Sequence, residues 1–366
     1  MNLPPIGCSK DNLDTPALCV DLDVMEANIR SIVAMCRKHG VNWRPHAKCH
    51  KSPAIAQKLI QAGAIGVTCA KLGEAEIFAA GGVRDMLIAN MIVGPKKLAR
   101  LVALRRQADP IVCADHSDQV VAFSRGMSEA GLTLRILVEV NIGMDRVGIA
   151  PGEPAIELAR QVNDLPGVQL AGIMGYEGHL LTVPDPAEKE TKIRESLAVL
   201  ADAKRQLEQA GLPCPIVSCG GTGSFAYSIQ QPEVTELQAG GCIFMDAFYR
   251  HACQVTEWDF ALTVIATIVS RPTPERAVID AGRKTMNITI HPAEFAGRND
   301  IEIQGLHAEH GILKLAPTAQ DLKIGDRLEI VPGYSDLTCV LHDHFFGFRQ
   351  GKLEVIWPLQ ARGRLQ

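Results

Sequence analysis

The feature that most constrains the fold is an alternation of short β-rich runs with longer amphipathic stretches. The β-rich runs in the first two thirds of the chain are Trp43–His46, Gly66–Ala70, Met86–Ala89, Pro110–Ala114, Leu134–Val140, Gln169–Gly175, Pro215–Cys219 and Thr235–Gln238. The clearest helical patterns between or beside them are Val24–Lys38, Ser52–Gln61, Glu74–Ala80, Lys96–Arg106, Glu153–Gln161 and Ala187–Ala210. This alternation predicts a parallel (β/α)8 barrel. A doubly wound open sheet is the alternative, because periodicity does not show whether a sheet closes.

The pattern of apolar residues changes after about Tyr249. Short β-branched runs separated by Pro and Gly turns follow, with no long helical segment among them: Leu262–Ser270, Arg276–Ala281, Gly311–Leu315, Arg327–Pro332 and Lys352–Trp357. This pattern predicts an antiparallel β domain. The apolar stretch Thr15–Leu22 could supply a strand to either domain. We therefore predict a barrel over residues 23–248 and a β domain formed by residues 1–22 and 249–366.

Composition narrows the functional class. The 366 residues carry 37 Lys+Arg against 41 Asp+Glu, a net charge of -4, which gives no reason to expect a nucleic acid or an anionic membrane as partner. The apolar runs are shorter than the ~18–20 residues that span a bilayer, and the N-terminus has no signal-peptide pattern. None of the 11 cysteines forms a C-x-x-C pair. We expect reduced, buried thiols in a cytoplasmic enzyme that acts on a small molecule.

A basic cluster closes the first barrel strand. It reads Arg44-Pro-His46-Ala-Lys48-Cys-His50-Lys51. A lysine at the C-terminal end of a barrel strand lies at the catalytic mouth of such a fold. Neighbouring cations would lower the pKa of the Lys48 amine and suit it to a Schiff base with an aldehyde. A solvated basic loop, or a phosphate-binding patch without covalent chemistry, is the simpler interpretation of the cluster alone.

A glycine-rich turn follows the seventh predicted strand. Gly221, Thr222, Gly223 and Ser224 offer backbone and hydroxyl donors to an anion, and Gly240 with Gly241 after the eighth strand could complete the cradle. The loops after strands 7 and 8 of such barrels often bind phosphate. A glycine turn alone is a weak signal. Together with the upstream lysine, it indicates a cofactor that carries both an aldehyde and a phosphate, which is pyridoxal 5'-phosphate.

Ordered motifs along nearly the whole chain resemble one family. They read DTPALCVDL, RPHAKCHK, VEVNIGMDRVGI, VSCGGTGS, TELQAGGCIFMD, AEHG and PGYSDLTCVLHD. They are similar to the D-threonine aldolase/D-serine dehydratase-like family of fold-type III pyridoxal-phosphate enzymes, whose N-terminal barrel is like that of alanine racemase. The resemblance implies a barrel, a C-terminal β domain and a homodimer in which the β domain helps to close the partner's site.

The resemblance also implies roles for individual residues. Lys48 corresponds to the lysine that binds the cofactor, beside His46, and Arg146 to an arginine near the cofactor's phenolate. Tyr176 corresponds to a tyrosine that lines the cofactor pocket, and the glycine turn to the phosphate cup. Without the family, Arg146 is better explained as a surface ion-pair residue. Tyr176 is equally well explained as an ordinary aromatic at a strand end.

This chain departs from the family pattern at two places. A metal-binding histidine is expected two residues before Asp336, but Tyr334 stands there, and a phenol is a poor ligand for a divalent metal. A site for Mn, Mg or Zn is therefore in doubt, although Asp336 could recruit His342 or His344. The base histidine expected six residues after Tyr176 is replaced by Thr182, and His179 is the nearest substitute. His179, His342 and His344 could equally be structural.

Three functions remain open. The leading hypothesis is a lyase, either an aldolase or a dehydratase, that acts on D-configured β-hydroxy-α-amino acids such as D-threonine, D-serine or 3-hydroxy-D-aspartate. His179, His310 and Asp336 are its candidate acid–base groups, with His310 included because it lies in the AEHG motif. The second is an amino-acid racemase with Lys48 and Tyr334 as opposed bases. The third is a non-catalytic barrel that carries pyridoxal phosphate or binds a phosphate ligand.

Overall fold

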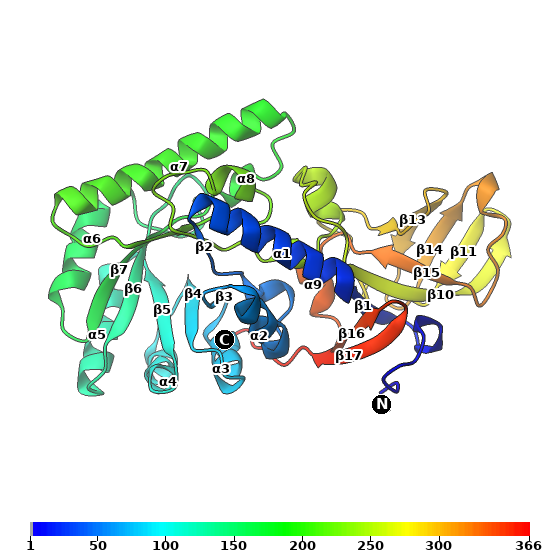
Figure 1. The fold of residues 1–366 in the computed structure, drawn as a ribbon, viewed down its shortest axis with the longest axis horizontal. Helices are drawn as coiled ribbons and strands as arrows, with labels where there is room; N and C mark the ends of the chain where they lie inside the picture. Colours follow the sequence, from blue (N-terminus) through cyan, green and yellow to red (C-terminus); the bar gives the residue numbers. More distant parts are fainter. Residues whose placement is uncertain (1–2) are drawn as a thin grey trace. The chain divides into compact units, whose positions relative to one another are not determined.

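The computed structural model describes residues 3–366 and divides them into two compact units. The barrel unit comprises Ile32–Gly240 with Gly363–Gln366, and the β unit comprises residues 3–31 with Gly241–Arg362. Most elements of the two units are labelled in Figure 1. No helix among residues 3–366 is long and apolar enough to cross a membrane.

The barrel unit is built on eight parallel strands. They are β2 (Asn42–Trp43), β3 (Val67–Cys69), β4 (Asp85–Met91), β5 (Asp109–Ala114), β6 (Leu134–Glu139), β7 (Val168–Met174), β8 (Ile216–Cys219) and β9 (Glu236–Leu237). Their order is β2-β9-β8-β7-β6-β5-β4-β3. The two ends of this sheet are joined, because Ile65 N donates to Trp43 O and Thr68 N to Pro45 O, both at 2.9 Å. The sheet therefore closes, which confirms the predicted barrel and rules out the open sheet.

Helices alternate with these strands along the chain (Figure 1). They are α1 (Leu22–His39), α2 (Pro53–Ala62), α3 (Leu72–Ala80), α4 (Pro95–Arg105), α5 (Ser117–Glu129), α6 (Glu153–Asp164), α7 (Pro186–Gln209) and the short α8 (Phe225–Ser228). The sequence prediction missed α5, whose buried face includes Val120, Phe123, Ser124 and Met127. The spacing is helical, but the serine on this face and Gly126 beside it weaken the apolar signal.

Apolar side chains fill the middle of the barrel, and charged ones fill one end. Leu87, Ile111 and Leu137 belong to one buried cluster and are fully inaccessible to solvent. Each such side chain contributes about 1.5–3 kcal/mol to folding. Asp85, Asp109, Arg135 and Glu236 lie at the N-terminal ends of β4, β5, β6 and β9. Arg44 follows the short strand β2, and its side chain joins this group. The charged groups therefore mark the N-terminal end of the barrel.

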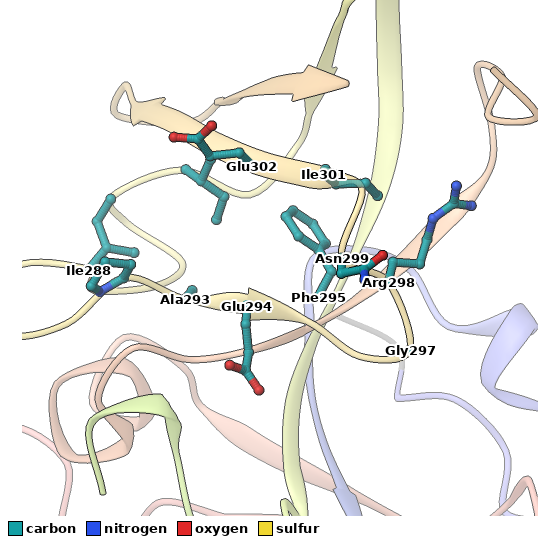
Figure 2. Close-up of a pocket in the computed structure, with 11 residues that line it drawn as sticks. Ile288, Ala293, Glu294, Phe295, Gly297, Arg298, Asn299, Ile301 and Glu302 are labelled. Atoms are coloured by element: carbon teal, nitrogen blue, oxygen red, sulfur yellow. The ribbon is translucent and has the colours of Figure 1, made fainter. Parts of the chain in front are cut away.

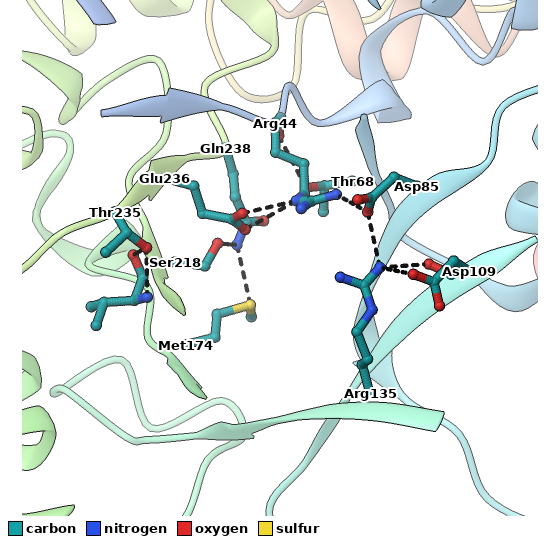
Figure 3. Close-up of polar contacts among 11 residues, drawn as sticks. Arg44, Thr68, Asp85, Asp109, Arg135, Met174, Ser218, Thr235, Glu236 and Gln238 are labelled. Carbon is teal, nitrogen blue, oxygen red and sulfur yellow. Dashed lines mark hydrogen bonds and ion pairs between the residues drawn. The ribbon is translucent and has the colours of Figure 1, made fainter. Parts of the chain in front are cut away.

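The charged end is a connected network (Figure 3). Arg44 Nε donates to both carboxylate oxygens of Glu236 at 3.0–3.1 Å, and its NH1 donates to Asp85 at 2.6 Å. Arg135 lies 3.3 Å from Asp85 and 2.8 Å from Asp109. Arg44 and Glu236 are both 2 % exposed, so each is the main compensation for burying the other.

The β unit contains a nine-stranded, mostly antiparallel sheet with one parallel pair, β1·β16. Its elements are β1 (Ala17–Asp21), β10 (Leu262–Thr273), β11 (Arg276–Ile279), β12 (Glu294–Phe295), β13 (Ile301–Leu306), β14 (Gly311–Leu315), β15 (Arg327–Val331), β16 (His344–Arg349), β17 (Lys352–Pro358) and the short helix α9 (Ser335–Cys339). The ambiguous N-terminal strand lies here, as β1, paired with β10 and β16. Leu13, Cys19, Ile265 and Phe348 pack in its core. The sequence prediction missed β12, β13 and β16.

None of the eleven cysteines is in a disulfide, and ten of them are buried, as predicted; Cys8 is half-buried.

Candidate active site

Lys48 lies at the C-terminal end of the first barrel strand. It is the middle residue of a single 3-10 turn, Ala47–Cys49, and its backbone N–H donates to His46 Nδ1 at 3.3 Å. The loop after β9 packs closely on this turn. A Cβ built at Gly240 would lie 2.2 Å from His46 O, so only glycine fits there. The thiol of Cys49 donates to Gly240 O at 3.4 Å. The structure thus places Lys48, His46 and Gly240 together at the mouth of the barrel.

The cations predicted to surround Lys48 are largely neutralised. Lys51 forms a buried ion pair with Glu74, and Arg44 is held by Glu236 and Asp85. Burial, together with the charges of Lys48, Lys51 and Arg146, lowers the pKa of His46 well below its usual range. Burial lowers the pKa of His50 to about 3, so both imidazoles are neutral at neutral pH. Arg44 and Lys51 therefore each have a carboxylate partner, and the activation of Lys48 by neighbouring like charges stays a prediction.

Arg146 lies on a loop after β6 that the side chain of Asn141 holds in place by hydrogen bonds. Asn141 Oδ1 accepts hydrogen bonds from the backbone of Gly143 at 3.0 Å and of Asp145 at 3.2 Å. Asn141 Nδ2 donates to the Asp145 carboxylate at 2.7 Å. The exposed guanidinium of Arg146 then lies 5.7 Å from the centroid of the Tyr176 ring, within cation–π range. The NIGMDR motif thus folds into a loop that presents a cation beside an aromatic face.

Tyr176 connects this loop to the glycine turn. It lies two residues after the end of β7, and a Cβ at Gly178 would lie 2.3 Å from its ring. A Cβ at Gly221, after β8, would lie 2.9 Å from its phenol oxygen. The exposed His179 approaches the Arg146 loop, because a Cβ at Gly143 would lie 3.0 Å from His179 Nε2. Arg146, Tyr176, His179 and Gly221 therefore lie together at the C-terminal ends of β6, β7 and β8.

The hydroxyl of Ser224 forms hydrogen bonds to residues that hold the glycine turn in place. It donates to Glu177 Oε1 at 2.5 Å and accepts from Gly221 N at 3.1 Å. Ser228 donates to the same Glu177 oxygen at 2.7 Å. Glu177 is fully buried, so its carboxylate is a fixed anchor for the turn. The Ser224 hydroxyl therefore stabilises the glycine turn, and its hydrogen bonds are made to Glu177 and Gly221.

The other predicted site residues lie in the β unit. Tyr334 Oη donates to Asp336 at 2.8 Å, and its ring packs edge-on against Phe248 at 5.3 Å and Tyr249 at 6.0 Å. Gly241 lies against the same aromatic group, because a Cβ there would be 2.4 Å from the Tyr249 ring.

The buried Asp246 fixes this aromatic group through its backbone. It accepts from Tyr249 N at 2.9 Å and from Ser335 N at 2.8 Å. Burial raises the pKa of Asp246 to about 7 despite these two hydrogen bonds. The Tyr334–Asp336 pair is therefore built into a rigid turn.

The predicted metal ligands do not form a metal site in the described chain. His342 Nε2 lies 2.8 Å from the carbonyl oxygen of Thr285, and burial lowers the pKa of His342. His310 is exposed in the turn before β14. No group of three or more His, Cys, Asp or Glu side chains within residues 3–366 is arranged to hold a metal ion. A phenol and one carboxylate do not replace the family's histidine and carboxylate, so these residues do not fit the family-type metal.

The residues of the barrel unit do fit pyridoxal phosphate. An amine for its aldehyde, a cation for its phenolate and a glycine turn for its phosphate all lie at the C-terminal ends of parallel strands, which share one end of the barrel. Gly221 and Gly240 are positions where a Cβ would strike Tyr176 and His46, so the close backbone approach is obligatory.

A cavity in the β unit contains none of the predicted site residues (Figure 2). It has a volume of about 690 Å³ and is lined by Phe295, Ile301 and Ile303 together with Glu294, Arg298 and Glu302. Its arginine is already paired with Asp300 and Asp321. The cavity offers neither an amine nor an imidazole for the predicted chemistry.

Sequence reasoning missed Glu139, Asn141 and Glu177. Each stands inside or beside a recognised motif, VEVNIGMDR or YEGH, and this adjacency is the signal that could have found them. Glu139 and Glu177 are buried carboxylates next to the predicted cofactor residues, with 3 % and 0 % exposure.

We expect Glu177→Ala to weaken pyridoxal-phosphate binding. Removing the carboxylate frees the hydroxyls of Ser224 and Ser228, and the glycine turn loses its anchor. Hydrogen bonds to a charged acceptor contribute about 1.5–3 kcal/mol each, so we expect the dissociation constant to rise roughly 10–100-fold. Absorbance titration with the cofactor measures this constant. Glu190→Ala, at an exposed ion pair with Arg194 on α7, is the control and should change it less than about twofold. An unchanged constant in Glu177→Ala would contradict the anchoring role.

Two family models match the chain in sequence. The model described as "Alanine racemase, N-terminal domain" covers residues 20–247, and the "Putative serine dehydratase domain" covers residues 261–348.

Full-length relatives extend this match. The chain is 37% identical to a D-threonine aldolase of Arthrobacter sp over 99% of this chain and 97% of the relative. It is 34% identical to a 3-hydroxy-D-aspartate aldolase of Paracoccus denitrificans (strain Pd 1222), over 98% and 94%. The crystal structure of a D-threonine aldolase from Filomicrobium marinum superposes with a TM-score of 0.96 at 36% identity, covering 99% of this chain and 100% of that one. The chain belongs to the D-threonine aldolase/D-serine dehydratase-like family, in which an alanine-racemase-type barrel is joined to a serine dehydratase domain.

Proposed function

We propose that this protein is a pyridoxal-phosphate-dependent lyase, and specifically an aldolase, that cleaves D-configured β-hydroxy-α-amino acids. The observation that carries the proposal is the joint placement of Lys48, Arg146, Tyr176 and the glycine turn at one end of a closed barrel. The high similarity to aldolases over the whole chain supports cleavage of a carbon–carbon bond. Substrates of the size of D-threonine or 3-hydroxy-D-aspartate follow from those relatives.

Different residues of the barrel would bind different parts of the cofactor. Lys48 would hold it covalently through the ε-amine, and the Gly221–Ser224 turn with Gly240 would hold its phosphate. Arg146 would face the phenolate oxygen, with Tyr176 packed beside the guanidinium. The neutral His46 would border the same space without adding charge. When bound, the cofactor supplies an electron sink that stabilises negative charge at the substrate's α-carbon.

Retro-aldol cleavage needs a base at the β-hydroxyl. That base takes the hydroxyl proton, the carbon–carbon bond breaks towards the α-carbon, and the departing half leaves as an aldehyde. A proton returned to the α-carbon completes glycine. We assign the hydroxyl proton to His179, because it stands on the loop after β7 beside the Arg146 loop. The Lys48 amine is the group that would exchange the α-carbon proton. His310 and Asp336 remain the alternative acid–base groups at the hydroxyl.

A racemase is the second candidate, and one observation favours it. Tyr334 stands where the family places a metal histidine, and its hydroxyl donates to Asp336 at 2.8 Å. A phenol whose proton is held by a carboxylate is suited to proton exchange at an α-carbon opposite a lysine.

Product analysis separates these reactions. Purified protein is incubated with pyridoxal phosphate and D-threonine, with L-threonine as the stereochemical control. We expect acetaldehyde and glycine in equal amounts from D-threonine, at a rate at least about 100-fold above that with the L isomer. A 2-oxo acid with ammonia would identify a dehydratase, and loss of optical rotation without a new carbonyl would identify a racemase. No conversion of any D-β-hydroxy amino acid would overturn the proposal.

The metal is tested in the same assay. Because the donors of the described chain do not fit the family-type site, we expect the activity to survive EDTA treatment. Activity that is lost with EDTA and restored by Mn²⁺ would show that other groups hold a metal.

A cytoplasmic homodimer is part of the proposal. The eleven cysteines, none of them in a disulfide, support a reducing compartment, and the dimer follows from the family resemblance. Light scattering of the purified protein should give twice the mass of the 39.6 kDa chain.

A further inference from the structure

Glu139 is a buried carboxyl directly behind the predicted cofactor site. It is the last residue of β6 and is 3 % exposed. Its Oε2 atom has no hydrogen-bond partner among residues 3–366. A small cavity of about 10 Å³ lies against it, lined also by Asn141, Arg146 and Tyr176. This volume is at the lower limit for a single water molecule, so solvent offers the carboxyl little compensation.

The charges around Glu139 are few and can be named. Arg146 is the positive group that acts on the carboxyl, Asp115 is the negative one, and the thiol of Cys113 is in hydrogen-bonding contact with it. Asp115 is itself engaged, because it accepts from Gly148 N at 2.9 Å and from the side chain of Gln119 at 2.9 Å. Burial raises the pKa of Glu139 to about 7, with Arg146 opposing the shift.

The placement of Arg146 depends on its own loop and on one aromatic contact. Asn141 fixes the backbone of its loop, but the guanidinium makes no ion pair within 4 Å in the described part of the chain, and its ring contact is Tyr176. Glu139 and Tyr176 line the same small cavity as Arg146. The exposed side of Arg146 is the side left for a ligand.

We propose that Glu139 is a positioning residue of the cofactor site, which acts through Arg146 and sets how much positive charge the guanidinium presents to the cofactor's phenolate oxygen. The inference rests on the proposed function, because it needs the cofactor beside Arg146. With Glu139 protonated, the phenolate meets the full charge of the arginine. With Glu139 ionised, part of that charge is offset from behind. The state of a buried acid thus tunes the cofactor without touching it.

The visible absorbance of the bound cofactor reports this tuning. The wild-type protein, Glu139→Gln and Glu139→Asp are loaded with pyridoxal phosphate, and the protonation of the chromophore is followed by absorbance against pH. In Glu139→Gln the charge of Arg146 is never offset, so we expect the chromophore to lose its proton about one pH unit earlier than in the wild type. Glu139→Asp keeps an ionisable carboxyl but draws it back from Arg146 by one methylene, so we expect a smaller displacement in the same direction. Glu157→Gln, an exposed carboxyl on α6, is the matched control and should leave the curve unchanged.

The outcomes are distinguishable. A Glu139→Gln curve that coincides with the wild-type curve, even with a lowered melting temperature, would reduce Glu139 to a structural residue and overturn the inference. A wild-type protein that binds no cofactor would overturn the proposed function together with it. If Glu139→Gln does not fold by circular dichroism, the Asp variant carries the test, because its shorter carboxyl should displace the curve measurably in the same direction.

Discussion

Lys48→Ala is expected to stay colourless after incubation with pyridoxal phosphate and to lose lyase activity by roughly 10³–10⁶-fold, the range seen when a covalent catalytic group is deleted. Lys48 is the lysine at the C-terminal end of the first barrel strand, on the turn packed against Gly240. Its neighbour Lys51 is not a substitute, because Glu74 holds its amine in a buried ion pair. Activity is measured as aldehyde release, and cofactor attachment by the visible band.

Lys48→Arg provides the matched control for charge. A guanidinium keeps the positive charge but does not form the covalent link, so we expect this variant to be as inactive as Lys48→Ala. Circular dichroism should show that both variants are folded. Full activity in either variant would exclude covalent attachment at this residue and would favour a barrel that only binds a phosphate ligand.

The second large effect is expected on stability, from Arg44→Ala. The substitution leaves Glu236 buried at 2 % exposure without its charge partner and removes a hydrogen bond from Asp85. Removing one partner of a buried ion pair costs about 3–5 kcal/mol, because the remaining charge is neither hydrated nor paired. We expect the barrel unit to melt at a temperature lower by at least several degrees.

Arg205→Ala is the control for an exposed ion pair. Arg205 is paired with Glu233 at 2.8 Å but is half exposed, so its loss should cost less than about 1 kcal/mol. Calorimetry or urea titration of both variants measures the difference. An Arg44→Ala variant as stable as Arg205→Ala would mean that the network at the N-terminal end of the barrel does not stabilise the fold.

The barrel strands were predictable because they are buried on both faces. Strands β5 and β6 have apolar centres, Pro110–Ala114 and Ile136–Val138, and the amphipathic stretches between the barrel strands have a clear helical period. Closure of the barrel was not predictable, since it depends on hydrogen bonds between Trp43 and Ile65 and between Pro45 and Thr68 that leave no periodic trace. In the β unit, β13 carries Glu302 and Gln304 at alternate positions and therefore gave a weak signal.

The glycines and the lysine of the predicted site could be identified from the sequence. The ion pairs and buried carboxylates around them could not. Arg44 and Lys51 read as free cations because their partners lie far along the chain, Glu236 at 192 residues and Glu74 at 23. An isolated glutamate in a sequence is ordinarily exposed, so the only signal at Glu139 and Glu177 was their place in the VEVNIGMDR and YEGH motifs. Tyr334 was identified as a departure from the family, yet its bond to Asp336 depends on the turn that Asp246 fixes.

Chemical trapping of the cofactor tests the central claim most directly. The protein is loaded with pyridoxal phosphate, reduced with borohydride, digested and analysed by mass spectrometry. The account predicts loss of the visible band on reduction and a single modified peptide, with the pyridoxyl group on Lys48. A label on a different lysine, or a protein that takes up no label at all, would contradict it.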